Sequence, residues 1–111
     1  MLNRAAITVR PKQPYLDWAG TLDDSGILPD KGGETTVYLV PEYVDDFEAA
    51  EVLSKVYDII FEEELFAWHT READWPIDRS FSMFRDWFDV EFHSIVEDIC
   101  GDPLKDDENE A

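Results

Sequence analysis

The chain has 111 residues, of which 27 are acidic and 9 are basic, so its formal net charge at pH 7 is −18. An acidic surface repels phosphate backbones and anionic lipid, which argues against direct nucleic-acid binding and against membrane binding. Basic proteins and metal cations remain compatible with this charge. The composition is 44% hydrophobic and 14% aromatic, which predicts a folded domain with its own core rather than a disordered chain.

The compartment is predicted from cysteine usage and hydropathy. Cys100 is the only cysteine, so no disulfide forms within the chain, and a secreted fold held by disulfides is disfavoured. The first ten residues contain no apolar signal-peptide core, and no apolar run approaches the length of a membrane span. These features predict a cytoplasmic protein of bacterial type.

The first third of the chain predicts one strand and one short helix. Apolar and polar residues alternate over 5–10, which is typical of a strand. Pro14 suits the first turn of a short helix that ends near Gly20. A turn at 23–26 and an exposed loop at 28–33 are then predicted from their aspartates, glycines and proline.

Residues 35–40 are the clearest strand, because they are β-branched and aromatic and lie between Gly33 and Pro41. Their almost unbroken apolarity predicts an interior strand of a sheet.

The longest periodic segment runs from Asp45 to about Thr70 and predicts a helix. Asp45 or Asp46 can cap its first N–H groups. Charged residues recur at intervals of three and four and predict one solvated face, formed by Glu48, Glu51, Lys55, Asp58 and Glu62. Since apolar residues occupy most of the remaining circumference, the helix is expected to be mostly buried.

The segment after this helix has two interpretations. Trp75 precedes Pro76 and must leave helical geometry, so 72–78 is predicted to be a loop. Phenylalanines and isoleucines recur at helical spacing over 80–100, which fits one long helix, whereas the alternation after Phe88 fits a strand. We favour a short helix to about Trp87 followed by a strand over 88–99, because two strands alone form a marginal sheet.

Together the elements predict an α+β domain over residues 1–103. It contains a small antiparallel or mixed sheet of about three strands, packed by one long helix and one or two short helices. Residues 104–111 are predicted to be a disordered acidic tail, because they are too charged to pack.

No motif for catalysis, a cofactor or a metal is present. His69 lies close in sequence to Glu72 and Asp74, but the spacing matches no zinc or calcium site. Both histidines are therefore expected at helix ends or on the surface. Cys100 lies among acidic residues that disfavour a thiolate, so it is interpreted as a packing residue. An enzyme would require a concave pocket holding a carboxylate, or His69, with a shifted pKa.

The aromatic residues are the more suggestive feature, because four tryptophans and seven phenylalanines are more bulk than a small core readily absorbs. Aromatic anchors surrounded by charge are typical of protein interfaces. The candidate partner-binding residues are Trp68, Trp75, Phe81, Phe84, Trp87, Glu62 and Glu63. In the competing interpretation, all four tryptophans fill the ends of the core.

Three functional interpretations follow. The first is a non-catalytic protein-binding or regulatory module whose aromatic surface contacts a protein partner, either a second copy of the chain or a basic protein. The alternative is an acidic protein that resembles DNA in its charge and binds basic nucleic-acid-binding proteins. The third is an enzyme or a metal-binding protein, for which the sequence offers no motif.

Overall fold

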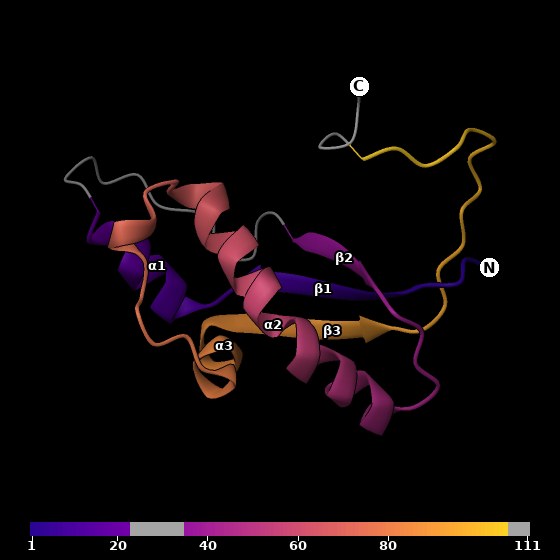
Figure 1. Ribbon diagram of the computed structural model, residues 1–111, viewed down its shortest axis with the longest axis horizontal. Coiled ribbons are helices and arrows are strands. Elements are labelled where there is room, and N and C mark those ends of the chain that lie inside the picture. Colours follow the sequence, from indigo (N-terminus) through magenta and orange to yellow (C-terminus); the bar gives the residue numbers. More distant parts are fainter. Residues whose placement is uncertain (23–34, 107–111) are drawn as a thin grey trace.

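The computed structural model describes residues 1–22 and 35–106, which form an α+β arrangement as predicted (Figure 1). In chain order the elements are β1 (Ala5–Pro11), α1 (Gln13–Gly20), β2 (Thr36–Val40), α2 (Asp46–Trp68), the 3-10 helix η1 (Glu72–Asp74), α3 (Phe81–Trp87) and β3 (Phe88–His93). The turn at 23–26 and the loop at 28–33 lie outside the described residues.

The three strands form an antiparallel sheet in the order β2-β1-β3. Ile7 in β1 lies opposite Tyr38 in β2 and Phe92 in β3, so these three side chains share one face. The prediction that 35–40 is an interior strand is wrong, because β1 is the central strand and β2 is an edge. Val37 and Leu39 are 59% and 49% exposed, since they lie on the opposite face of the sheet.

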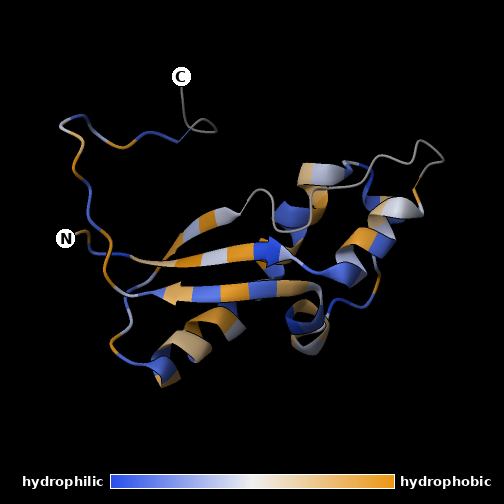
Figure 2. Cartoon of the chain, turned by 180° about the vertical axis from the view of Figure 1, so that it is seen from behind, coloured by the Kyte–Doolittle hydropathy of each residue, from blue (hydrophilic) through white to orange (hydrophobic). Residues whose placement is uncertain are grey.

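The long helix α2 crosses one face of this sheet (Figure 1), and in the reverse view the strands lie in front of it (Figure 2). Ile7 and Val9 of β1 are fully buried within the same core cluster as Leu53 and Phe61 of α2. Each such side chain contributes about 1.5–3 kcal/mol by leaving water. The apolar core thus lies between one helix and one sheet.

The start of α2 is set by side-chain caps, as predicted. The Asp45 carboxylate accepts a hydrogen bond from the Glu48 N–H at 2.8 Å, and the Glu48 carboxylate accepts one from the Val44 N–H at 2.9 Å. The helix ends at Trp68, two residues before the predicted end, and His69 is its extended C-terminal cap. The chain then turns into η1.

The solvated face predicted for α2 is confirmed, because all five of its charged residues are exposed. The expectation that the remaining surface is mostly buried is wrong. Phe47, Ile59 and Phe66 are all more than half exposed. The physical reason is that a three-stranded sheet forms a single layer and covers only one side of α2.

The segment after α2 splits into helix and strand, as favoured above. Ser80 caps α3 by accepting a hydrogen bond from the Met83 N–H at 3.1 Å, and β3 starts immediately after Trp87. The strand is shorter than the predicted 88–99, because its last ladder pair joins His93 to Ala6, close to the start of β1. Beyond His93, the Val96 carbonyl accepts a hydrogen bond from the Leu2 N–H, and the N-terminal ammonium of Met1 lies 3.0 Å from the Glu97 carboxylate.

Further predictions concern Trp75, Cys100 and the C-terminal residues. Trp75 has extended backbone geometry before Pro76, as expected, although the preceding residues form η1. Cys100 is exposed, so the prediction that it packs in the core is wrong; it follows the end of β3 by seven residues, where the chain no longer packs against the sheet. Residues 104–106 are exposed, and 107–111 lie outside the described residues. No helix in the described part is long and apolar enough to cross a bilayer.

Candidate functional site

Two of the predicted partner-binding aromatics belong to the core. Phe84 is fully buried and its ring lies 5.8 Å from that of Phe61, because α3 directs this side chain toward α2. Trp75 is buried as well, and its indole N–H donates to the His69 carbonyl at 2.8 Å. Both side chains are buried in the core and add little to the exposed surface of the molecule.

The other three predicted aromatics are half-buried against the core. The Trp87 ring lies 5.6 Å from that of Phe61, and the Phe81 ring lies 5.2 Å from that of Tyr57. Trp68 packs against the same core cluster from the end of α2. The structure therefore favours the interpretation in which the tryptophans fill the ends of the core.

Glu62 and Glu63 are exposed on α2. A guanidinium nitrogen of Arg79 lies 3.1 Å from the Glu62 carboxylate, and the same guanidinium lies over the Trp75 ring at 5.9 Å from its centroid. Glu62 thus ties the loop before α3 to α2, whereas Glu63 has no ion pair within the described residues.

A pair of apolar residues beside these glutamates was missed from the sequence. Ile59 and Phe66 are 60% and 55% exposed, and they lie two helical turns apart on the solvated face of α2. We call this surface the outer face of α2, formed by Glu48, Glu51, Lys55, Asp58, Ile59, Glu62 and Phe66. The sequence could have predicted their exposure, because Ile59 and Phe66 each follow a charged residue of the solvated face, Lys55 and Glu62, by four positions.

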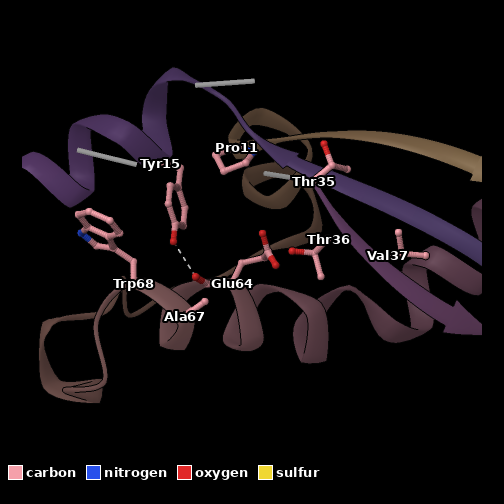
Figure 3. Close-up of a pocket in the computed structure, with 8 residues that line it drawn as sticks. All are labelled: Pro11, Tyr15, Thr35, Thr36, Val37, Glu64, Ala67 and Trp68. Carbon is pink, nitrogen blue, oxygen red and sulfur yellow. Dashed lines mark hydrogen bonds between the residues drawn. The ribbon is translucent and has the colours of Figure 1, made fainter. Parts of the chain in front are cut away.

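The opposite, inward side of α2 borders a hollow of about 420 Å³ (Figure 3). Its lining combines a carboxyl, two aromatic rings, two threonines and small apolar groups. The residues are Pro11, Tyr15, Thr35, Thr36, Val37, Glu64, Ala67 and Trp68.

Three elements bring the polar groups of this hollow together. Glu64 and Trp68 are four residues apart on α2 and therefore share one face of the helix. Tyr15 enters from α1, and Thr36 enters from the first residue of β2. In Figure 3 the Thr36 hydroxyl and the Glu64 carboxyl point toward each other, and the Tyr15 hydroxyl points at the backbone of Glu64.

Glu64 is 7% exposed and is the only buried charged residue in the described part of the chain. The Tyr38 hydroxyl donates to its carboxylate at 2.5 Å, and Thr36 forms a second side-chain hydrogen bond with it. The Tyr15 hydroxyl donates to the Glu64 carbonyl at 2.6 Å. The carboxyl thus joins edge strand β2 to α2, and the backbone of the same residue joins α1 to α2.

Burial raises the pKa of Glu64 above its ordinary value, and the neighbouring charge of Glu63 acts in the same direction. The hydrogen bonds from Tyr38 and Thr36 favour the ionised form and oppose part of this shift. Burial also raises the pKa of Tyr38 and of Tyr15, with Glu64 adding to both shifts, so both hydroxyls remain protonated donors.

In the sequence, Glu64 is one of three consecutive glutamates, Glu62-Glu63-Glu64. Its helical phase distinguishes it, because it follows the buried Ile60 by four residues. That spacing could have found a buried carboxyl, although not the two tyrosines that approach it.

The two histidines lie where the sequence placed them. His69 caps the end of α2 and is half-exposed, and its Nε2 atom lies 2.8 Å from the Asp74 carboxylate. His93 is exposed at the end of β3. Within residues 1–22 and 35–106, no three side chains of histidine, cysteine, aspartate or glutamate are grouped to hold a metal ion.

Comparisons with models of protein families, with curated proteins and with solved structures find no match to this chain. The outer face of α2 and the hollow beside Glu64 are the two candidate functional surfaces of the described residues.

Proposed function

We propose that the protein is a non-catalytic binding module that docks a basic protein on the outer face of α2. The observation that carries this proposal is the position of Ile59 and Phe66. Both side chains are more than half exposed on the helix face that carries the exposed carboxylates of α2, with Ile59 between Asp58 and Glu62 and Phe66 one turn after Glu62. Apolar anchors within a charged rim are the usual composition of an interface centre.

The two kinds of residue contribute differently to binding. Burying Phe66 and Ile59 against a partner removes apolar area from water and slows dissociation. Asp58 and Glu62 lie within one turn of Ile59, Glu62 also lies one turn before Phe66, and Glu51 lies about two turns before Ile59. Their field attracts a cationic surface and speeds association. The proposed contact surface is therefore the outer face of α2 rather than the tryptophans.

The charge also favours one class of partner. Two copies of a chain with net charge −18 repel each other, so a homodimer through this face is disfavoured. A basic protein meets no such repulsion. Nucleic-acid-binding proteins form one group of basic proteins, and in that case the carboxylates of α2 would occupy a phosphate-binding groove.

Enzymatic activity is the competing function. An enzyme would require a concave pocket that holds a carboxyl with a shifted pKa, and the hollow beside Glu64 has both features. Glu64 is the single carboxyl among its described lining residues, and no histidine, cysteine or lysine accompanies it there. Its hydrogen bonds to β2 and α1 serve the fold. We therefore keep binding as the proposal, with the cytoplasm as its compartment.

The test compares two double variants that remove similar amounts of exposed apolar surface. Ile59→Ser with Phe66→Ser alters the outer face of α2, and Val37→Ser with Leu39→Ser alters the open face of the sheet as a matched control. Proteins are captured from lysate on the wild-type chain at low salt, identified, purified and then titrated against each variant. We expect the α2 variant to weaken binding by roughly tenfold or more and the control to change it little.

Three outcomes contradict the proposal. These are an acidic partner, equal loss of affinity in the two variants, and an affinity that does not fall between low and physiological salt. Competition with duplex DNA then separates the two kinds of basic partner. Displacement by DNA identifies a nucleic-acid-binding protein, and continued binding identifies a partner that uses another basic surface.

A further inference from the structure

The hollow beside Glu64 takes no part in docking at the outer face of α2, because it lies on the inward side of that helix. We infer that this hollow binds an organic cation, an alkylammonium or alkylguanidinium group, whose charge pairs with the Glu64 carboxylate and whose stem contacts the rings of Tyr15 and Trp68. The inference uses different residues from the proposed function and stands or falls separately from it.

The sign of the ligand follows from the lining. Among the lining residues that the structure describes, Glu64 carries the only charged side chain, and no lysine, arginine or histidine accompanies it there. Glu63, the residue just before Glu64 on α2, adds a second negative charge close to this carboxyl. The hollow therefore repels anions and attracts cations, the more strongly because its buried carboxyl is poorly screened by water.

The Glu64 carboxylate can also accept further hydrogen bonds. An ionised carboxylate offers about four hydrogen-bond acceptor positions. Tyr38 and Thr36 each account for one hydrogen bond. The remaining positions can accept N–H groups from an ammonium or a guanidinium, and hydrogen bonds between charged groups are the stronger kind.

The rest of the lining suits the stem of such a ligand. Tyr15 and Trp68 present aromatic rings, which attract a cation through their π electrons. Pro11 and Ala67 add apolar surface for methylene groups. The volume of about 420 Å³ lies within the range of roughly 300–1,000 Å³ that is usual for small-ligand sites.

Binding should release a proton in part of the pH range. Burial raises the pKa of Glu64, and a bound cation would lower it again by favouring the ionised form. The groups facing this carboxyl are Tyr38 on β2, Tyr15 on α1 and Glu63 on α2, and the raised pKa of each tyrosine keeps its hydroxyl protonated there. Affinity for the cation should thus rise with pH and then level off.

The experiment titrates the intact protein with butylammonium and butylguanidinium and follows the backbone and the Trp68 indole by NMR. Butanol is the neutral control ligand. Glu64→Gln is compared with Glu63→Gln, which removes the same charge from the adjacent, exposed position. We expect a dissociation constant on the order of 1 mM for wild type and for Glu63→Gln, at least a tenfold loss in Glu64→Gln, and tighter binding at higher pH. The spectrum of each variant verifies its fold.

The inference is overturned if butanol binds as well as butylammonium, if the two glutamine variants lose affinity equally, or if neither the free cations nor a lysine or arginine peptide shifts the Trp68 signal. Should Glu64→Gln fail to fold, Trp68→Leu replaces it, because it removes the ring and leaves the carboxyl in place; unchanged affinity for the cations then overturns the inference. A free amine that binds best indicates a small-molecule ligand. A peptide that binds best indicates the side chain of a protein.

Discussion

Glu64 shows how one side chain can serve three elements. Its carboxyl accepts hydrogen bonds from the hydroxyls of Tyr38 and Thr36 on β2, and its carbonyl accepts one from the Tyr15 hydroxyl on α1. A buried polar group is costly unless its hydrogen bonds are made, and every buried side-chain nitrogen or oxygen in the described residues has a partner. The same burial makes the stability of the fold depend on the protonation of this residue.

The first prediction concerns Glu64→Gln and pH. Because the pKa of Glu64 is raised in the folded state, the folded protein holds this proton more tightly than the unfolded chain does. Its favourable contribution is complete below the unfolded pKa and is lost as pH rises through the folded pKa. We therefore expect the free energy of unfolding of Glu64→Gln to improve relative to wild type as the pH rises above the ordinary glutamate pKa of about 4.3, measured by urea unfolding.

Glu63→Gln is the control for this measurement, because it changes the net charge equally at an exposed site. An identical pH response in the two variants would show that general charge, rather than burial of Glu64, causes the effect.

At the scale of the element, capping side chains set where α2 begins, and the position of each residue around the helix axis decides whether it faces the sheet or solvent. The Asp45 carboxylate accepts the Glu48 N–H, a donor that the first helical turn leaves unpaired, and the Glu48 carboxylate accepts the N–H of Val44, just before the helix. Farther along, Phe61 faces the sheet and Phe66 faces solvent. Helical phase separates two residues that look alike in the sequence.

The second prediction concerns the cap of α2. Asp45→Ala removes the acceptor of the Glu48 N–H and should lower the free energy of unfolding by about 1 kcal/mol. Asp46→Ala is the matched control, because Asp46 is the first helical residue and is exposed. Chemical denaturation of both variants tests this, and equal losses would mean that the charge at the helix start matters rather than the hydrogen bond.

The third prediction compares two phenylalanines of the same helix. Phe61 is fully buried, and its ring lies between about 5 and 6 Å from three other core rings. Phe61→Ala should cost about 3–5 kcal/mol. Phe66→Ala should change the stability by less than about 0.5 kcal/mol, since its ring is more than half exposed. Thermal unfolding of both measures this, and a large loss in Phe66→Ala would place that ring in the core.

At the scale of the whole molecule, charge and packing oppose each other. Every acidic side chain in the described residues except Glu64 is exposed, and the chain as a whole has three times as many acidic as basic residues. Their mutual repulsion destabilises the compact state, whereas the single helix-on-sheet core stabilises it. The same charge draws a basic partner to α2.

The fourth prediction follows from this repulsion. Added salt screens like charges on the surface, so the midpoint of thermal unfolding should rise as NaCl increases from about 10 mM to 300 mM. A variant that exchanges exposed Glu51 and Asp58 for glutamine and asparagine should start from a higher midpoint and respond less to salt. A midpoint that falls with salt would show that favourable ion pairs outweigh the repulsion.

Local features of the sequence were enough for the elements and the fold class. The cap at Asp45, the solvated face of α2 and the break before Pro76 each depend on residues adjacent in the chain or one turn apart. The split at Trp87 between helix and strand also follows from local alternation. Such features act over a few residues, and therefore a sequence displays them directly.

The tertiary structure decided which apolar residues meet one another. The order β2-β1-β3 placed β2 at an edge, and the single layer of sheet left Val37 and Leu39 exposed on its open face and Ile59 and Phe66 exposed on α2. The hollow beside Glu64 needs Tyr15, which is 49 residues away in the chain. Burial and pocket shape depend on contacts between distant segments, and for this reason both candidate sites appear only once the chain is folded.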